Sequence, residues 1–305
     1  MRVFLTGATG YIGESVLEAF SRAGHEVTAA VRNPARLSNA AARAAQVTTA
    51  DLSEPASWAG ALAGHDVLVH TAYEASARGP AVDRAVVEAF LAEGRRAAGE
   101  GRPVTVLYTS GVWVLGPTQA PADEAAPLAP TPLVAWRPAH EALVLGANGN
   151  GLRAAVIRPG VVFGGSRGIV GELMRGGANG LIRVIGTGQN RWPLVYTRDL
   201  ADLYVRLATA PDAFGVFHAS DESDERVIDL VEAIAAHMKT PPDIRYIPIE
   251  EARAKHGPYA DAITLDQVVR CPRSRAIGWE PSFKSVTANV SRLFEEWRQG
   301  SESGE

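Results

Sequence analysis

The feature that most constrains the fold is a run of three glycines, Gly7, Gly10 and Gly13, between a short apolar segment and a helix-like segment. Glycine permits a tight turn at the first position, a close approach of a ligand at the second, and close packing of strand and helix at the third. Free backbone N–H groups and the positive end of the helix dipole then face the turn. The sequence therefore predicts a phosphate-binding turn that leads from a strand into a helix.

The first 160 residues alternate apolar runs rich in Val, Ile and Leu with helix-like stretches, a pattern typical of a parallel sheet covered by helices on both faces. The expected strands are Arg2–Thr6, Glu26–Val31, Ala45–Thr48, Asp66–His70, Val104–Thr109 and Arg153–Arg158. The expected helices are Tyr11–Ala23, Ala56–Ala63, Ala81–Ala98 and Pro132–Gly146. We therefore predict an α/β fold, a Rossmann-type doubly wound parallel sheet, as a dinucleotide-binding domain over residues 1–165.

Beyond Gly164 the pattern changes to mixed short elements, which predicts a smaller C-terminal α/β lobe over residues 166–300, partly interleaved with the first domain. Its expected helices are Asp199–Ala208, Val227–Met238, Ala260–Val269 and Lys284–Arg298. The small and acidic residues 301–305 are expected to form a frayed tail. The proline-rich loop at 117–132 is expected to act as a mobile flap.

Charge and cysteine content exclude several classes of protein. The formal net charge is -4 and the basic residues are scattered, so we expect no nucleic-acid partner. Cys271 is the single cysteine, which excludes an internal disulfide and metal sites built on paired thiolates, and we expect no metal. The apolar run before residue 7 is too short for a signal peptide or a membrane span. We expect a cytoplasmic protein without membrane contact.

The glycine spacing within Thr6–Gly13 resembles the extended and atypical short-chain dehydrogenase/reductase superfamily, which contains the sugar-nucleotide epimerases and dehydratases. Further segments of the chain agree with this resemblance, namely those that follow the third, fourth and sixth expected strands. The resemblance implies that an NAD(P) cofactor is contacted by Gly7, Thr9, Gly10, Tyr11, Ile12, Gly13, Asp51, Leu52, Thr71, Ala72, Pro159 and Val161. Asp51 serves equally well as a helix N-cap.

The residue after the second expected strand indicates which dinucleotide is bound. NAD-preferring members usually carry an acid there, which accepts from the ribose hydroxyls. This chain has Arg32 instead, whose guanidinium can pair with a 2′-phosphate. NADP(H) is therefore the favoured cofactor and NAD(H) the alternative, although Arg32 could equally be a surface arginine.

The usual catalytic pair is missing. The resemblance implies a Tyr and a Lys four residues apart on the helix after the fifth strand, and these positions are Leu133 and Arg137 here. Arg137 can hold ribose hydroxyls but is a poor proton carrier, because its pKa exceeds about 12. The usual catalytic Ser or Thr falls on Gly111, beside Ser110.

Another side chain must then donate the proton in any reaction. Tyr73 is our first candidate, because it follows the turn that underlies the cofactor. Ser110 and His140 are further candidates, and Tyr196 is a fourth. Each of them has a structural alternative as a packed or hydrogen-bonded side chain. Trp113 and Trp136 are interpreted as pocket walls or core residues.

Three functions remain open. The first is an NADP(H)-dependent oxidoreductase that acts on a small carbonyl, alkene or imine substrate with a non-standard proton donor. The second is a non-catalytic NADP(H)-binding sensor, and the third is an epimerase or lyase. The expected partner is a small molecule, with a possible homodimer through the helices Ala81–Ala98 and Pro132–Gly146.

Overall fold

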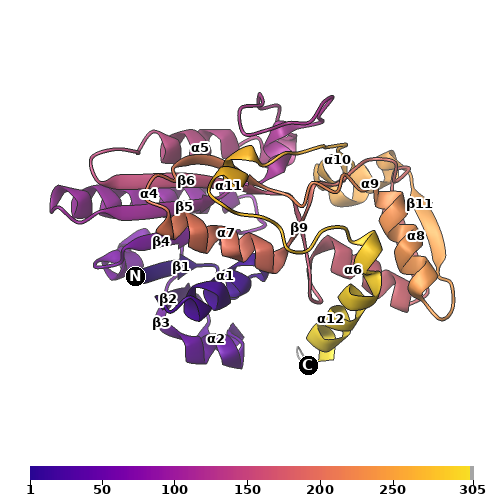
Figure 1. The fold of residues 1–305 in the computed structure, drawn as a ribbon, viewed down its shortest axis with the longest axis horizontal. Helices are drawn as coiled ribbons and strands as arrows, with labels where there is room; N and C mark the ends of the chain where they lie inside the picture. The colour runs from indigo at the N-terminus through magenta and orange to yellow at the C-terminus, as the bar shows by residue number, and fades with distance from the viewer. Residues whose placement is uncertain (303–305) are drawn as a thin grey trace.

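A seven-stranded parallel sheet forms the centre of the computed structural model, which describes residues 1–302 (Figure 1). The strand order is β3-β2-β1-β4-β5-β6-β10, and every neighbouring pair runs parallel. The bounds are β1 (Arg2–Thr6), β2 (Glu26–Val31), β3 (Ala45–Thr49), β4 (Val67–His70), β5 (Val104–Thr109), β6 (Leu152–Pro159) and β10 (Gly215–Ala219). The order reverses between β1 and β4, the point at which ligands bind in doubly wound folds. The predicted Rossmann-type sheet is confirmed.

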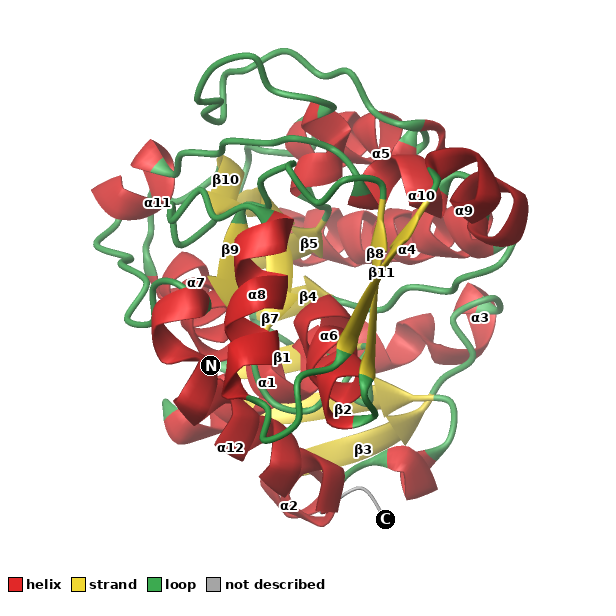
Figure 2. Cartoon of the chain, turned by 90° about the vertical axis from the view of Figure 1, so that its right-hand side faces the viewer, coloured by secondary structure: helices red, strands yellow, loops and turns green. Residues whose placement is uncertain are grey.

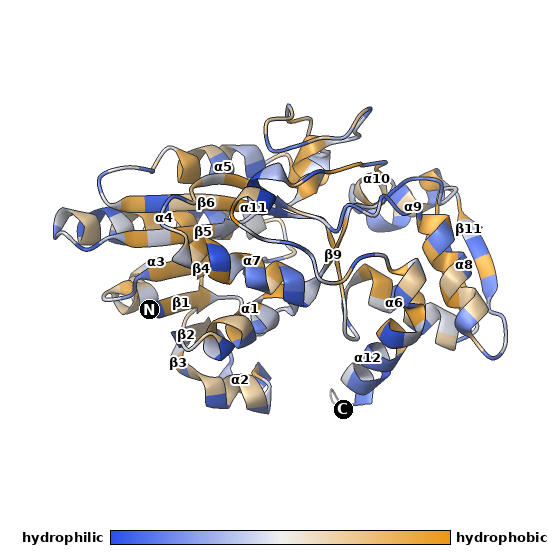
Figure 3. Ribbon diagram, in the orientation of Figure 1, coloured by the Kyte–Doolittle hydropathy of each residue, from blue (hydrophilic) through white to orange (hydrophobic). Residues whose placement is uncertain are grey.

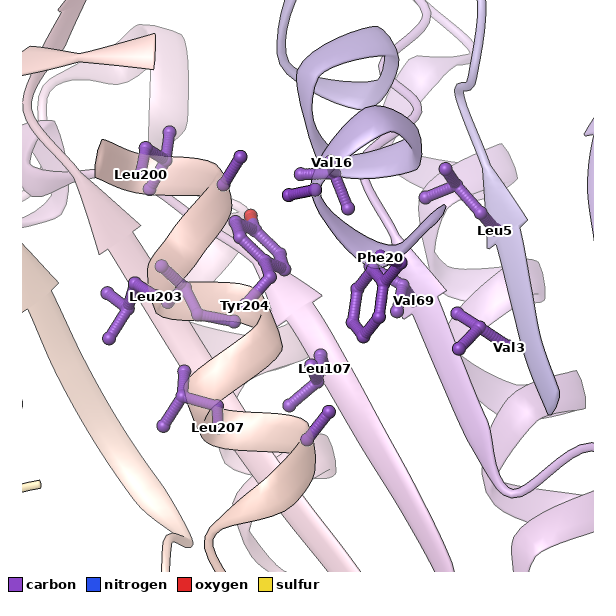
Figure 4. Close-up of a cluster of buried hydrophobic side chains, with 14 of the residues drawn as sticks. Val3, Leu5, Val16, Phe20, Val69, Leu107, Leu200, Leu203, Tyr204 and Leu207 are labelled. Carbon is purple, nitrogen blue, oxygen red and sulfur yellow. The ribbon is translucent and has the colours of Figure 1, made fainter. Parts of the chain in front are cut away.

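Helices cover both faces of this sheet. One face is covered by α1 (Tyr11–Arg22) and α7 (Thr197–Thr209), and the other by α4 (Gly79–Gly99) and α5 (Arg137–Leu145). The short helices α2 (Asn39–Ala44) and α3 (Pro55–Trp58) accompany the strands at the β3 edge. Figure 4 shows how the apolar stripes of α7 and α1 meet the sheet through Leu200, Leu203, Tyr204, Leu207, Val16, Phe20, Val3, Leu5, Val69 and Leu107. Burial of these side chains fixes both helices against the strands that carry the site.

The second lobe lies beyond the carboxyl end of β6 and has a core of its own (Figures 1 and 2). It contains two parallel ribbons, β7 with β9 and β8 with β11. Its elements are β7 (Val161–Phe163), α6 (Gly168–Ala178), β8 (Leu181–Ile185), β9 (Leu194–Tyr196), α8 (Val227–His237), β11 (Asp243–Ile247), α9 (Ile249–His256), α10 (Tyr259–Ile263) and α12 (Val290–Glu302). Helix α11 (Pro272–Ala276) packs near β10. In Figure 3 the strands of the central sheet are largely hydrophobic, whereas α12 is mostly hydrophilic.

The chain passes back to the first domain after entering the second lobe. Helix α7 packs against α1, and β10 pairs with β6 to form the last strand of the central sheet. The two parts of the fold are therefore built from interleaved segments.

Six strands were predicted to within one or two residues, but β10 was missed. Four helix predictions were wrong at their ends. The helix predicted over 56–63 is α-helical only to Trp58 and continues as a 3₁₀ helix. The segment 132–146 forms a 3₁₀ turn and then α5, because Pro138 lacks an N–H and fits only the first turn of a helix. The helix expected to reach Val269 ends at Ile263, and the one expected from Lys284 begins at Val290. Helix α12 extends to Glu302, and the rest of the predicted frayed tail, residues 303–305, lies outside the described residues.

The proline-rich loop at 117–132, expected to be a mobile flap, is bonded to the second lobe. Thr118 donates its N–H to Asp266 O (3.0 Å), and Ala122 donates to Val268 O (2.9 Å). Arg270 donates back to Ala122 O (2.9 Å). These backbone bonds also explain why 264–270 is extended rather than helical.

Candidate functional site

In the turn between β1 and α1, the space around the three glycines leaves no room for a larger side chain. Gly7 has a φ of +84°, and a Cβ added there would lie 2.5 Å from the backbone nitrogen of Ala72. A Cβ on Gly13 would lie 2.0 Å from the Gly7 carbonyl oxygen, and one on Gly10 would lie 3.0 Å from the same atom. The turn therefore packs β1, α1 and the end of β4 closely together and leaves a surface of bare backbone.

A cleft of about 290 Å³, here called the glycine cleft, lies over this turn. The predicted cofactor-contacting residues that line it are Gly7, Thr9, Gly10, Arg32, Asp51, Leu52, Thr71 and Ala72. Two arginines that the sequence analysis did not select, Arg36 and Arg167, also line the cleft. The carboxylates of Asp51, Glu74 and Asp83 line the cleft as well, so a phosphate would depend on the backbone N–H groups of the turn and on the placement of the arginines.

Asp51 lies at the end of the glycine cleft near β3. Its carboxylate accepts hydrogen bonds from the hydroxyl of Ser53 (2.7 Å) and from the backbone N–H of Ser53 (3.0 Å). These bonds lower the pKa of Asp51 below its ordinary value. Asp51 therefore closes a local turn, and Glu54, not Asp51, is the residue at the N-cap of α3.

A second cavity of about 270 Å³, here called the inner pocket, adjoins the glycine cleft through Tyr73, which lines both. The predicted residues that line it are Ile12, Tyr73, Ser110, Arg137, Pro159 and Val161. Trp113 and Trp136 lie in its wall, as the sequence indicated. The structure thus brings together residues from α1, α5, β6 and β7 with residues that follow β4 and β5.

Arg137 and Leu133 occupy the positions of the missing catalytic pair, and both line the inner pocket. The guanidinium of Arg137 donates to the Thr109 carbonyl (2.8 Å) and lies over the ring of Trp136, 4.5 Å from its centroid. It is 5.7 Å from the centroid of Tyr73. Leu133 lies in the 3₁₀ turn before α5, so the two side chains do not share one continuous helix. No phenol replaces the missing one at that place in the wall.

Ser110 is buried at the base of the inner pocket, and its hydroxyl donates to a carboxylate oxygen of Glu141. Glu141 in turn accepts from Nε of Arg158 at 3.1 and 3.2 Å. All three side chains are buried. The proton of Ser110 is therefore directed away from the pocket, and its lone pairs remain available to accept hydrogen bonds.

His140 lines neither cavity, so the structure does not bring it to the site. Its Nδ1 donates to Asp83 Oδ2 (2.7 Å), and the hydroxyl of Tyr108 donates to the same oxygen (2.9 Å). His70 Nε2 lies 3.2 Å from Asp83 Oδ1. Burial alone would raise the pKa of Asp83, but hydrogen bonds from His140 and His70 outweigh it and lower the pKa. His140 therefore connects α5 to α4.

Tyr11, Gly13 and Tyr196 also lie outside both cavities. The Tyr11 hydroxyl donates to Gly164 O (2.7 Å), and burial raises the pKa of Tyr11. The Tyr196 hydroxyl donates to Glu296 (3.0 Å), and burial and that carboxylate raise the pKa of Tyr196 to about 12. Tyr11 and Gly13 therefore shape the turn and its link to the second lobe, and Tyr196 is a packed side chain.

The sequence analysis missed Arg36 and Arg167. Arg167 follows β7, and its guanidinium lies 5.8 Å from the ring centroid of Tyr11 and 3.9 Å from Glu14 Oε2. Arg36 follows β2 in the same loop as Arg32. An arginine close to Arg32 in sequence was a detectable signal, whereas the approach of Arg167 depends on the placement of the second lobe.

The profile described as the NAD dependent epimerase/dehydratase family matches residues 3–219, which include the glycine turn, the inner pocket and the whole central sheet. The chain belongs to this family. A nicotinamide dinucleotide is the cofactor of the family, and the glycine turn with its backbone cradle fits one.

The relatives of this family member match between about half and nearly all of its length. An uncharacterised protein, C2A9.02, of Schizosaccharomyces pombe is 26% identical over 95% of this chain and 98% of its own. A 4-hydroxy-2-methyl-3-oxo-4-farnesyl-3,4-dihydroquinoline-1-oxide ketoreductase of Stigmatella aurantiaca is 35% identical over 54% of this chain and 51% of its own. The structure of human epimerase family protein SDR39U1 with NADPH superposes with a TM-score of 0.78 at 22% identity, covering 97% and 99% of the two chains. Among residues 1–302, no helix has the length and hydrophobicity needed to cross a bilayer.

Proposed function

We propose that this epimerase/dehydratase family member is an NADP(H)-dependent oxidoreductase that reduces a small carbonyl substrate. The observation that carries the proposal is that Tyr73 lines both cavities, so the cleft over the glycine turn and the small inner pocket are neighbours. The ketoreductase among its relatives and the human relative's structure with NADPH support both parts of the proposal.

The residues of the glycine cleft would hold the cofactor. The turn at Gly7 and Gly10 offers backbone N–H groups to the pyrophosphate, and Arg32 with Arg36 would pair with the 2′-phosphate. Arg137, already oriented by Thr109 O and Trp136, would hold ribose hydroxyls. A nicotinamide bound in the inner pocket supplies the hydride.

Tyr73 is the proposed proton donor. It is the one phenol among the described residues that line the inner pocket, and its side chain remains reachable by solvent, with 55% of the residue exposed. Ser110 is the proposed orienting residue, because its own proton is engaged by Glu141. In this assignment Tyr73 protonates the carbonyl oxygen and recovers its proton from water.

The test is calorimetric titration of the wild type and of R32A and R36A with NADPH and NADH. Loss of one charge-assisted hydrogen bond, about 1.5–3 kcal/mol, should weaken NADPH binding about tenfold to a hundredfold and leave NADH binding nearly unchanged. R84A is the matched control, because Arg84 lies on the outer side of α4 and pairs with Glu88. Equal loss of both nucleotides in R32A would refute the 2′-phosphate assignment.

A sensor that holds NADP(H) without catalysis is the second candidate, and the observation that favours it is Leu133 in the wall position of the missing phenol. The two functions differ in turnover. Ketone-dependent NADPH oxidation that Y73F slows at least tenfold would support the reductase, while tight NADPH binding without turnover of any ketone would support the sensor.

A further inference from the structure

Three large aromatic side chains line the inner pocket: Tyr73, Trp113 and Trp136. The rings of Tyr73 and Trp136 are parallel to within 2°, with centroids 6.5 Å apart. The ring of Trp113 is held edge to face against Tyr259 at 6.2 Å. The pocket thus offers fixed aromatic surfaces, which favour flat apolar molecules.

The rest of the wall is almost entirely apolar. Apart from glycine and proline it consists of Ile12, Val112, Leu133, Val134, Val161, Val162 and Ile169, together with Ser110 and Arg137. None of the residues within 1–302 that line this pocket is an Asp or a Glu. A substrate here would gain most from apolar contact, with polar contact confined to one small region near the reacting carbonyl.

The cations near the pocket already have other partners. Arg137 is bonded to Thr109 O and stacked on Trp136. Arg167, in the second lobe, lines the glycine cleft and lies 3.9 Å from Glu14 Oε2. In the proposed function the Arg137 guanidinium holds the cofactor ribose, so a diphosphate or carboxylate on the substrate would compete with the cofactor for the one guanidinium that the described residues place in the wall.

We propose that the substrate is an uncharged ketone whose carbonyl belongs to, or is conjugated with, a flat ring system, rather than a sugar nucleotide or an acyclic oxo acid. The inference rests on the proposed function. The ring system packs against Trp136, Tyr73 and Trp113. Hydride from NADPH forms the new C–H bond as the carbonyl π bond breaks, and the oxygen takes the Tyr73 proton, giving a secondary alcohol and NADP⁺.

The probes are α-tetralone, a bicyclic aryl ketone, and octyl methyl ketone, an acyclic ketone with the same number of carbons. We expect kcat/KM for α-tetralone to exceed that for octyl methyl ketone at least tenfold, and UDP-glucose to give no turnover. W136L should lower kcat/KM for α-tetralone about tenfold through KM, and W136F, which keeps an aromatic ring beside Arg137, should restore most of it and keep NADPH affinity within about twofold of the wild type. W297F is the control, because Trp297 is a partly buried side chain packed against the core of the second lobe and does not line the inner pocket.

Binding is measured separately by calorimetric titration of α-tetralone into the protein with and without NADP⁺. If NADPH binds but α-tetralone neither binds nor reacts, the inference is overturned and the cofactor assignment stands. A preference for the acyclic ketone, or for an oxo acid whose binding is lost in R137A, would also overturn it. If α-tetralone binds, W136L abolishes that binding, and no ketone is reduced, the pocket assignment stands and the proposed reductase fails.

Discussion

The buried ion pair beneath the inner pocket provides a demanding test of the structure. Glu141 and Arg158 have side-chain exposures of 2% and 4%, and Ser110 depends on the same carboxylate. E141L would leave the guanidinium buried without its counter-charge and the serine hydroxyl without its acceptor. Removal of one partner of a buried pair costs about 3–5 kcal/mol. We therefore expect E141L to lower the free energy of unfolding by about 3–5 kcal/mol.

Equilibrium urea unfolding, followed by tryptophan fluorescence, measures this loss. Two comparisons make the measurement specific. E88A removes the carboxylate of the exposed Arg84–Glu88 pair on α4, which is worth about 0.3–0.5 kcal/mol. The double variant E141L/R158M removes both buried charges, and a pair replaced by apolar side chains of similar volume is often neutral or stabilising.

The double variant should therefore recover most of the stability lost in E141L. A loss below about 1 kcal/mol in E141L would show that the carboxylate is not buried against Arg158 as described. A double variant less stable than E141L would show that packing, rather than the uncompensated charge, determines the cost.

Two further predictions concern the turn and a buried imidazole. G13A should abolish the NADPH-induced rise in melting temperature, because its Cβ would lie 2.0 Å from Gly7 O; G60A, whose Cβ meets nothing within 4 Å, should retain it. Burial and Arg158 lower the pKa of His218 from 6.5 to about 4, so the unfolded chain binds the proton first as pH falls. Between pH 6.5 and pH 4 the free energy of unfolding of the wild type should fall by up to about 3 kcal/mol, and H218Q should not show this loss. Urea unfolding of both proteins at both pH values measures the difference. Equal losses in the two proteins would contradict the prediction.

The sequence predicted the parts of the fold that depend on local pattern. The glycine turn, the strands buried on both faces and the cleft residues at the strand ends follow from periodicity and from the known position of ligands in parallel sheets. Strand β10 was missed, because Gly215–Ala219 becomes a central-sheet strand only by pairing with β6, which is distant in sequence. The predicted helix Pro132–Gly146 began too early. The apolar pattern suggested one continuous helix, but Pro138 fits only in the first turn of a helix, so α5 begins at Arg137.

The site was predictable where residues follow strands and unpredictable where partners are distant in sequence. His140 was a catalytic candidate, yet its environment is set by Asp83, 57 residues away. Tyr73 and Ser110 reach the pocket because they directly follow β4 and β5, and their catalytic roles stay predictions. The homodimer expected through α4 and α5 also stays a prediction.

The return of the chain to the central sheet affects how the protein can be made. Strand β6 receives its outer neighbour only when β10 has been synthesised, and β7, β8, β9 and α7 all precede β10 in the chain. Until then β6 presents unpaired N–H and C=O groups, and the face that α7 will cover stays open to other chains. A fragment that ends near residue 165 would lack α7 and β10, so the edge of β6 and the sheet face beneath α7 would stay exposed. Part of the second lobe must therefore be synthesised before the central sheet can gain its last strand.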